Sequence, residues 1–196
     1  LPNVRDRRVE FIHGSLAELD AALQRNGGRL IVQHARATEA IPRLARELGV
    51  SAVFSNRDYE PQAKARDANV AAELARNNIG FESFKDQAIF DGLEVLTLAG
   101  KPFTVFTPYK RAWLKRLTED DLTPHSTGGG TLVRPDSLAA LPSLAELGFE
   151  PTNLDSLGIT PGMRGARCLT EDFARRMAHY AERRDYPAIK GVSYLS

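Results

Sequence analysis

Apolar positions spaced for helices alternate with short apolar runs over the first 85 residues of the chain. Across residues 9–23 they recur at steps of three and four, which predicts one amphipathic helix that continues through Gly14. The alternative is a strand over residues 9–12 followed by a shorter helix, in which Ser15 and Glu18 would form a capping box. We favour the continuous helix because the apolar stripe keeps its phase on both sides of the glycine.

Three brief apolar runs bounded by turn signals predict buried strands, over residues 29–33, 51–55 and 80–85. Two further helices lie between them, one with Thr38 as its N-cap and one that begins at Pro61, a residue suited to the first helical position. This alternation predicts an α/β fold, a Rossmann-like doubly wound parallel sheet with right-handed crossovers. Three strands would be poorly covered and the series starts on a helix, so we expect the first strands to be missing, before Leu1.

The pattern changes near residue 117. A helix is expected over residues 109–117, and the residues that follow, 118–135, are rich in Pro, Gly, Ser and Thr, which marks a linker or surface loop. A new apolar seam over residues 163–180 then predicts a long helix. We therefore expect an α/β domain, a connector and the first helix of an all-α domain, over residues 1–117, 118–160 and 161–196 respectively.

Polar residues follow the second predicted strand at the edge of the sheet where ligands of parallel α/β proteins bind. Residues 56–60, Asn-Arg-Asp-Tyr-Glu, form either a ligand rim or an ordinary solvated loop. The helix over residues 109–117 carries Trp113 and four cations, which is typical of a nucleic-acid patch or of an amphipathic helix with solvated cations. For this helix we favour the amphipathic interpretation.

Composition excludes several classes of site. With Cys168 as its one cysteine, the 196-residue chain forms no intrachain disulfide and no thiolate metal cluster, which fits a cytoplasmic protein. No window approaches about eighteen consecutive apolar residues, so we expect no membrane span. The four histidines stand at no metal-binding spacing, and we predict no metal site. The net charge of +1 favours no class of partner.

Four separated motifs, in collinear order, carry a resemblance to a known family. The first is Val-Phe-Ser-Asn-Arg-Asp-Tyr-Glu-Pro over residues 53–61, followed by Arg66-Asp67. The second is Gly-Lys-Pro-Phe-Thr-Val-Phe-Thr-Pro-Tyr over residues 100–109, and the third is Leu-Pro-Ser-Leu-Ala-Glu-Leu-Gly-Phe over residues 141–149. The fourth is the tail from Tyr180, with Arg-Arg-Asp-Tyr-Pro-Ala and then Gly-Val-Ser-Tyr-Leu-Ser. Together they resemble the DNA photolyase/cryptochrome family, from its amino-terminal α/β domain to the start of its FAD-binding domain.

The resemblance implies a deoxyribodipyrimidine photolyase, a carbon–carbon lyase. In that family the α/β domain houses an antenna chromophore and the helical domain holds FAD. Light-excited reduced FAD donates an electron that splits a cyclobutane pyrimidine dimer, after the damaged bases have left the duplex. The expected partner is damaged DNA, and the full-length protein is expected to be a monomer. The alternatives are a cryptochrome-type blue-light photoreceptor and a free-standing nucleotide-binding α/β module.

The tail motif implies which residues of this chain meet cofactor and DNA. Arg184 is expected at a DNA phosphate, a contact that positions the protein without reading sequence. No catalytic residue is expected in this part of the chain. Val192 stands where the family has Thr, so one hydroxyl contact is lost or made by the backbone. The residues expected to bind FAD, through hydroxyl and backbone N–H donors suited to phosphate oxygens, are Tyr180, Val192, Ser193, Tyr194, Leu195 and Ser196.

The chain departs from the family pattern at both ends. The opening strand with its Trp-Phe-Arg run is absent, and the chain ends at Ser196, before the family's tryptophans and most of the DNA groove. We therefore expect a fragment that by itself neither holds FAD tightly nor repairs DNA. Folate-type relatives carry an Asn and a Glu near residues 99–101, which read Ala-Gly-Lys here, so the sequence does not single out a folate. The expected antenna is a folate, a deazaflavin or a flavin, and a protein without an antenna is the remaining alternative.

Overall fold

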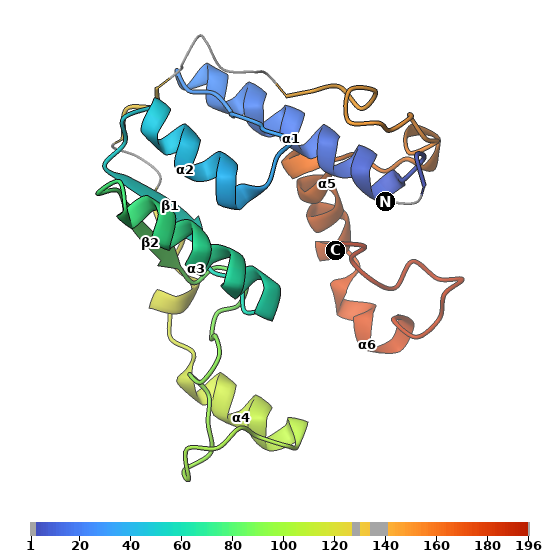
Figure 1. Ribbon diagram of the computed structural model, residues 1–196. Helices are drawn as coiled ribbons and strands as arrows, with labels where there is room; N and C mark the ends of the chain where they lie inside the picture. The colour runs from blue at the N-terminus through green and yellow to red at the C-terminus, as the bar shows by residue number, and fades with distance from the viewer. Residues whose placement is uncertain (1–2, 127–129, 134–140, 196) are drawn as a thin grey trace. The chain divides into compact units, whose positions relative to one another are not determined.

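The computed structural model describes residues 3–126, 130–133 and 141–195 (Figure 1). The chain forms two compact units, one from Leu1–His34 with Gly129–Ser196 and the other from Ala35–Gly128. The first unit therefore joins both ends of the chain, and the second is one continuous segment. The domain boundaries expected after residues 117 and 160 stay predictions. Parts of the expected connector, residues 127–129 and 134–140, lie outside the described residues.

The continuous unit is built on a parallel strand–helix–strand element. β1 (Ala52–Asn56) and β2 (Gly80–Phe84) pair in parallel along their whole length, and α3 (Pro61–Ala75) connects them. The helix begins with its proline, as predicted, because the missing N–H has no partner at that position in any case. The predicted α/β class is confirmed, with a two-stranded parallel sheet in the described part of the chain.

One face of this sheet is covered by α3 and by α2 (Ala37–Glu47). The buried core consists of Ala45, Val70, Leu74 and Ile79, against which Val53 of β1 and Phe81 of β2 pack. The side chain of Leu74 is 0% exposed, and burial of a leucine contributes about 1.5–3 kcal/mol. On the other face, Phe54 and Phe84 are exposed, and their rings stack with centroids 6.1 Å apart. Within its own unit, the sheet is therefore covered on one side.

The helix that carries the tryptophan, α4 (Phe106–Arg116), begins three residues before the predicted start at residue 109. Trp113 packs edge to face on Phe90, with ring centroids 5.4 Å apart, and the guanidinium of Arg116 lies 5.2 Å from the centroid of the same phenylalanine. The tryptophan thus packs against the unit while cations border it, as the amphipathic interpretation of this helix expects.

The other unit contains α1 (Arg7–Arg25) and α5 (Gly162–Ala174), which pack together (Figure 1). The continuous helix predicted for the start of the chain is confirmed, and the alternative with a strand and a capping box is wrong. Ser15 and Glu18 instead serve α5. The N–H of Gly162 donates to Ser15 Oγ over 3.0 Å, and the N–H of Arg164 donates to Glu18 Oε1 over 3.1 Å. These acceptors satisfy donors that the first turn of α5 leaves free.

The segment before α5 also lies along α1. Glu10 accepts hydrogen bonds from the backbone and the hydroxyl of Thr152, the backbone one over 3.0 Å. His13 Nε2 lies 2.9 Å from the carbonyl oxygen of Pro142. Farther along, η2 (Asp155–Leu157) leads to the start of α5. Residues from the two ends of the sequence are therefore held together by side chains of α1.

Two predicted elements differ from the structure. Residues 29–33 do not form a strand, because the backbone N–H of Leu30 donates to the buried carboxylate of Asp20 over 2.8 Å rather than to a neighbouring strand. Thr38 is not the N-cap of α2, whose N-cap is Arg36. In both places a local sequence signal was compatible with more than one backbone arrangement.

The long helix predicted over residues 163–180 is also wrong, because α5 ends at Ala174. The chain then forms a 3-10 turn, η3 (Met177–His179), and the short helix α6 (Tyr180–Arg183), which is labelled in Figure 1. The apolar seam continues through this break, which is why periodicity alone predicted one helix. The break brings Tyr180 to the first position of a new helix instead of the end of an old one.

Candidate functional site

The predicted cofactor residue Tyr180 is the first residue of α6, and its ring contacts another aromatic ring and a guanidinium group. Its ring packs edge to face on Phe173 of α5, with centroids 5.9 Å apart. The guanidinium of Arg184 lies 5.6 Å from the centroid of the same tyrosine ring. Two of the residues predicted to meet cofactor and DNA are therefore in direct contact, while Tyr180 remains 40% exposed and open to a ligand.

Arg184, the predicted DNA contact, keeps its charge accessible. Its side chain is 52% exposed, and its Nε lies 3.7 Å from Asp185 Oδ1, an exposed ion pair of the kind that contributes little to stability. Stacking on Tyr180 restricts the guanidinium without using up its hydrogen-bond donors, since a cation over a ring face leaves the N–H groups at its edge free. The arrangement suits a contact with a phosphate oxygen.

The tail after α6 is anchored at Gly191, which is buried. A Cβ at this position would lie 2.3 Å from the carbonyl oxygen of Arg183, so the tail approaches α6 more closely than any side chain permits. The guanidinium of Arg176 binds the same stretch by donating to the carbonyl oxygens of Lys190 and Val192. The backbone that carries the predicted FAD contacts is therefore held at two points.

The end of the tail presents hydrogen-bond donors. Among the described residues, the N–H groups of Val192, Ser193 and Tyr194 make no hydrogen bond, and the N–H of Leu195 donates to Ser193 Oγ over 3.3 Å. Tyr194 has a φ of 58°, a left-handed conformation that is uncommon for a residue with a side chain. This donor set fits the phosphate oxygens of FAD. The predicted contact at Ser196 lies outside the described residues.

The predicted FAD residues divide between two surroundings. Tyr194 and Leu195 line a mostly apolar cavity of about 980 Å³, which α1 and α5 also line through Phe11, Leu169 and neighbouring residues. Tyr180, Val192 and Ser193 are not among its lining residues. The structure thus brings two of the predicted residues to a cavity, whereas Tyr180 is exposed on α6 and Val192 and Ser193 are half-buried in the tail.

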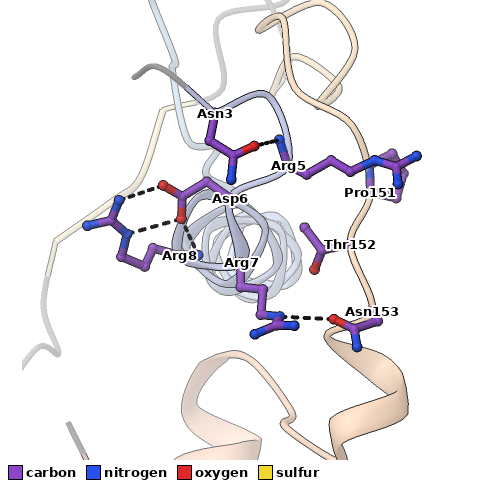
Figure 2. A pocket seen from close by; sticks show the side chains of 8 residues that line it. All are labelled: Asn3, Arg5, Asp6, Arg7, Arg8, Pro151, Thr152 and Asn153. Atoms are coloured by element: carbon purple, nitrogen blue, oxygen red, sulfur yellow. Dashed lines mark hydrogen bonds and ion pairs between the residues drawn. The ribbon is translucent and has the colours of Figure 1, made fainter.

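A second cavity lies at the start of α1 and was missed by the sequence reasoning (Figure 2). Three arginines line it, and each has an acceptor: Arg5 binds Glu150 over 2.7 Å, Arg7 binds Asn153 over 2.9 Å, and Arg8 binds Asp6. The signal was present as the run Arg-Asp-Arg-Arg over residues 5–8, but the partners of Arg5 and Arg7 lie about 145 residues away and are invisible to local patterns.

Asp6 also lines this cavity and is the N-cap of α1, where it accepts from the N–H of Arg8 over 2.9 Å. The side-chain hydrogen bond from Arg8, followed by the backbone one, lowers the pKa of Asp6 from 3.8 to about 2. A carboxylate that stays ionised among the arginines disfavours the binding of an anion. We therefore interpret the cluster as one that stabilises the start of α1.

Residues of the predicted ligand rim, at the carboxyl end of β1, form hydrogen bonds with residues at and just after the end of β2. The N–H of Arg57 donates to Phe84 O over 2.7 Å, and its guanidinium donates to Ser83 O over 3.2 Å. Asn56 Nδ2 donates to Asp86 Oδ2 over 2.8 Å. The loop is thereby tied to the end of β2, and ligand binding at this rim stays a prediction.

Two classes of feature are absent from the described part of the chain. It contains no group of three or more His, Cys, Asp or Glu side chains arranged to hold a metal ion. None of its helices has the length and apolar character needed to cross a bilayer.

Comparison with known proteins places these features in a family context. The sequence profile of a family described as DNA photolyase matches residues 2–128. The deoxyribodipyrimidine photo-lyase of Synechococcus sp. (strain ATCC 27144 / PCC 6301 / SAUG 1402/1) is 32% identical, over 96% of this chain and 40% of its own length. That of Escherichia coli (strain K12) is 30% identical, over 99% of this chain and 41% of its own length.

Solved structures agree with the sequence relatives. The chain resembles a bacterial class III photolyase from Agrobacterium tumefaciens with a TM-score of 0.81 and 29% identity, over 100% of this chain and 41% of the other. It resembles an archaeal photolyase from Sulfolobus tokodaii, described with two FAD molecules, with a TM-score of 0.71 and 25% identity, over 95% of this chain and 39% of the other. The chain thus spans about two fifths of the length of these relatives.

Proposed function

Because the chain belongs to the DNA photolyase family, we propose that it is part of a deoxyribodipyrimidine photolyase, a light-driven lyase that repairs cyclobutane pyrimidine dimers in DNA. The observation that carries the proposal is the tail. The tail combines a partly exposed tyrosine, Tyr180, with an accessible arginine, Arg184, that lies over its ring. The same segment carries several backbone N–H donors without a hydrogen-bond partner among the described residues. In the proposed enzyme these three elements serve flavin, DNA phosphate and flavin phosphate respectively.

In this proposal the tail forms one edge of the FAD site. The N–H groups of Ser193 and Tyr194 and the Ser193 hydroxyl bind phosphate oxygens, and Val192 contributes backbone only because its side chain lacks a hydroxyl. Leu195 and the ring of Tyr194 supply apolar surface, and Tyr180 contacts the cofactor through its exposed face. Reduced FAD bound at this edge would supply, once excited by light, the electron that splits the dimer.

Arg184 has a separate task in the same proposal. Its half-exposed guanidinium contacts a phosphate of the damaged strand beside the flavin edge, because it stacks on the tyrosine that touches the cofactor. Such a contact strengthens binding to any DNA sequence and makes it salt-dependent. The α/β unit is proposed to house the antenna, which is a folate, a deazaflavin or a flavin; the absorbance of the purified protein distinguishes these classes.

The test uses the protein produced from its complete coding sequence. We expect flavin absorbance after purification and the loss of cyclobutane dimers from an irradiated oligonucleotide under blue light but not in darkness. FAD without repair would contradict the lyase assignment and favour a photoreceptor of the same fold. Absence of FAD would contradict the proposal as a whole.

A matched pair of variants tests the role of Arg184. Arg184→Gln is expected to weaken DNA binding and to lower the slope of log affinity against log salt concentration by about 1, the change for one lost phosphate contact. Arg183→Gln, which removes another exposed charge one residue earlier on α6, is the control. Equal losses in both variants would assign the effect to net charge and would contradict a specific contact.

A further inference from the structure

Arg176 stands between α5 and η3, and its guanidinium binds acceptors from two places. It pairs with Asp172 one turn back on α5, where Nε and Nη2 lie 3.0 and 2.9 Å from Oδ2. It also reaches the tail, where Nη1 donates to the carbonyl oxygen of Lys190 and Nη2 donates to that of Val192 over 2.9 Å. The side chain is only 16% exposed, so solvent competes little for these donors.

The acidic partner makes the arrangement rigid. Asp172 Oδ2 also accepts from Lys190 Nζ over 2.9 Å, so one carboxylate oxygen joins α5 to the tail through two cations. The hydrogen bonds from Lys190 and then Arg176 lower the pKa of Asp172, because both cations favour its ionised form. With one edge of the guanidinium on Asp172, its planar fork points the remaining donors toward the carbonyls of the tail.

Holding these carbonyls fixes the direction of the N–H groups that follow them. The carbonyl of Val192 and the N–H of Ser193 belong to the same peptide unit, which is planar and trans and therefore places them on opposite sides of the backbone. When Arg176 binds the carbonyl, the N–H of Ser193 points away from Arg176 and stays free of hydrogen bonds within the described residues. The same peptide geometry at Lys190 fixes the N–H of Gly191, which donates to Ile189 O over 2.7 Å.

We propose that Arg176 is a positioning residue for the flavin-phosphate contacts of the tail. By clamping the carbonyls of Lys190 and Val192, it orders the segment before the cofactor arrives, so that binding does not bear the cost of fixing that backbone. The claim that the tail binds FAD rests on the proposed function, whereas the claim that Arg176 orders the tail backbone does not. Arg176 itself does not touch the cofactor.

The neighbouring arginine provides a matched control. Arg175 has the same charge and lies one residue earlier, but it is exposed, and its Nε donates over 3.2 Å to the carbonyl oxygen of Glu171 on its own helix. Arg175→Gln therefore changes the charge as much as Arg176→Gln does and leaves the clamp intact. Arg176→Lys keeps the charge beside Asp172 but lacks the fork that spans carboxylate and carbonyls.

The first measurement is hydrogen exchange of the tail without flavin, followed by mass spectrometry of peptides over residues 186–195. Arg176→Gln is expected to speed exchange at the Ile189 and Gly191 amides by roughly tenfold to a hundredfold, the effect of losing charge-assisted hydrogen bonds. Arg175→Gln is expected to exchange like the parent protein, and Arg176→Lys to lie between. An unchanged far-ultraviolet circular dichroism spectrum separates loss of tail order from loss of the fold. Tail exchange in Arg176→Gln that matches Arg175→Gln would overturn the proposal.

The second measurement is FAD affinity, from flavin fluorescence titrations of the same variants of the complete protein. Arg176→Gln is expected to raise the Kd for FAD about tenfold, with partial recovery in Arg176→Lys and no change in Arg175→Gln. Faster exchange with an unchanged Kd would overturn the proposal, because the order of the tail would then not serve the cofactor. If the parent protein binds no FAD, the proposed function fails and the positioning role toward FAD fails with it, while exchange alone still reports whether the clamp orders the tail.

Discussion

The capping of α5 by side chains of α1 can be tested by removing the hydroxyl of Ser15 and the negative charge of Glu18. Ser15 Oγ and Glu18 Oε1 accept from the N–H groups of Gly162 and Arg164, at the first and third positions of α5. Those donors have no partner within their own helix. We predict that the double variant Ser15→Ala, Glu18→Gln destabilises the unit formed by the two ends of the chain.

The magnitude follows from three opposing effects. Loss of a side-chain N-cap acceptor costs about 1 kcal/mol, and loss of a negative charge at a helix N-terminus costs about 0.3–1 kcal/mol. Against these, alanine in place of serine inside α1 gains about 0.5 kcal/mol of helix propensity. The caps outweigh the propensity, so the net loss is about 1 kcal/mol in the free energy of unfolding.

Urea unfolding followed by circular dichroism measures this loss, and hydrogen exchange over residues 162–165 localises it. Ser15→Thr keeps an oxygen acceptor and is expected to retain most of the stability. Ser156→Ala, which removes an exposed hydroxyl bonded to Asn153 O, is expected to stay within about 0.5 kcal/mol of the parent. The reasoning is refuted if the double variant is as stable as the parent, or if Ser15→Thr loses as much as Ser15→Ala.

Three further predictions concern the core, the first turn of α1 and the tail. Leu74→Ala is expected to cost about 2–5 kcal/mol in urea unfolding, because Leu74 is fully buried, whereas Leu98→Ala on the surface is expected to be neutral. Asp6 has a pKa lowered from 3.8 to about 2, so its contribution to stability is complete above pH 4 and is lost as the pH falls to 2; Asp6→Asn is expected to remove that part of the acid dependence of unfolding. Gly191→Ala is expected to speed hydrogen exchange in the tail, because the added Cβ would lie 2.3 Å from a backbone carbonyl of α6, whereas Gly130→Ala, which meets open space, is expected to change nothing.

Each of these has an outcome that contradicts it. Equal losses from Leu74→Ala and Leu98→Ala would show that the core is not where the structure places it. If the stability of the Asp6→Asn variant falls between pH 4 and pH 2 as steeply as that of the parent, the titration of Asp6 does not cause this loss of stability. Tail exchange that Gly191→Ala leaves unaltered would mean that the tail does not pack on α6.

Several elements could be predicted from sequence because their signals are local. The apolar stripe of α1 repeats every three to four residues, and a proline opens α3 at the position where it loses no hydrogen bond. The runs that form β1 and β2 flank that helix, so a parallel strand–helix–strand element follows from chain order alone. The tail motif was likewise readable as a resemblance, because its residues are consecutive.

Tertiary structure decided what local signals left open. Ser15 and Glu18 had the spacing of a capping box, yet their partners lie about 146 residues away on α5. Residues 29–33 had the composition of a strand, but Asp20 takes the backbone N–H that a strand would share with its neighbour. After residue 163, the spacing of apolar residues does not change at the break between α5 and α6, so no signal in the sequence marks that break.

The tail shows the same division most clearly. The identity of its residues determined which atoms are available to a cofactor, since hydroxyl, backbone N–H and guanidinium groups are written in the sequence. Their directions depend on Arg176 and on the close approach of Gly191 to α6, and both are contacts across a fold. The sequence specifies which hydrogen-bond donors are present, and tertiary packing sets the directions in which they point. The reason is that a hydrogen bond needs two atoms within about 3 Å, whatever their separation along the chain.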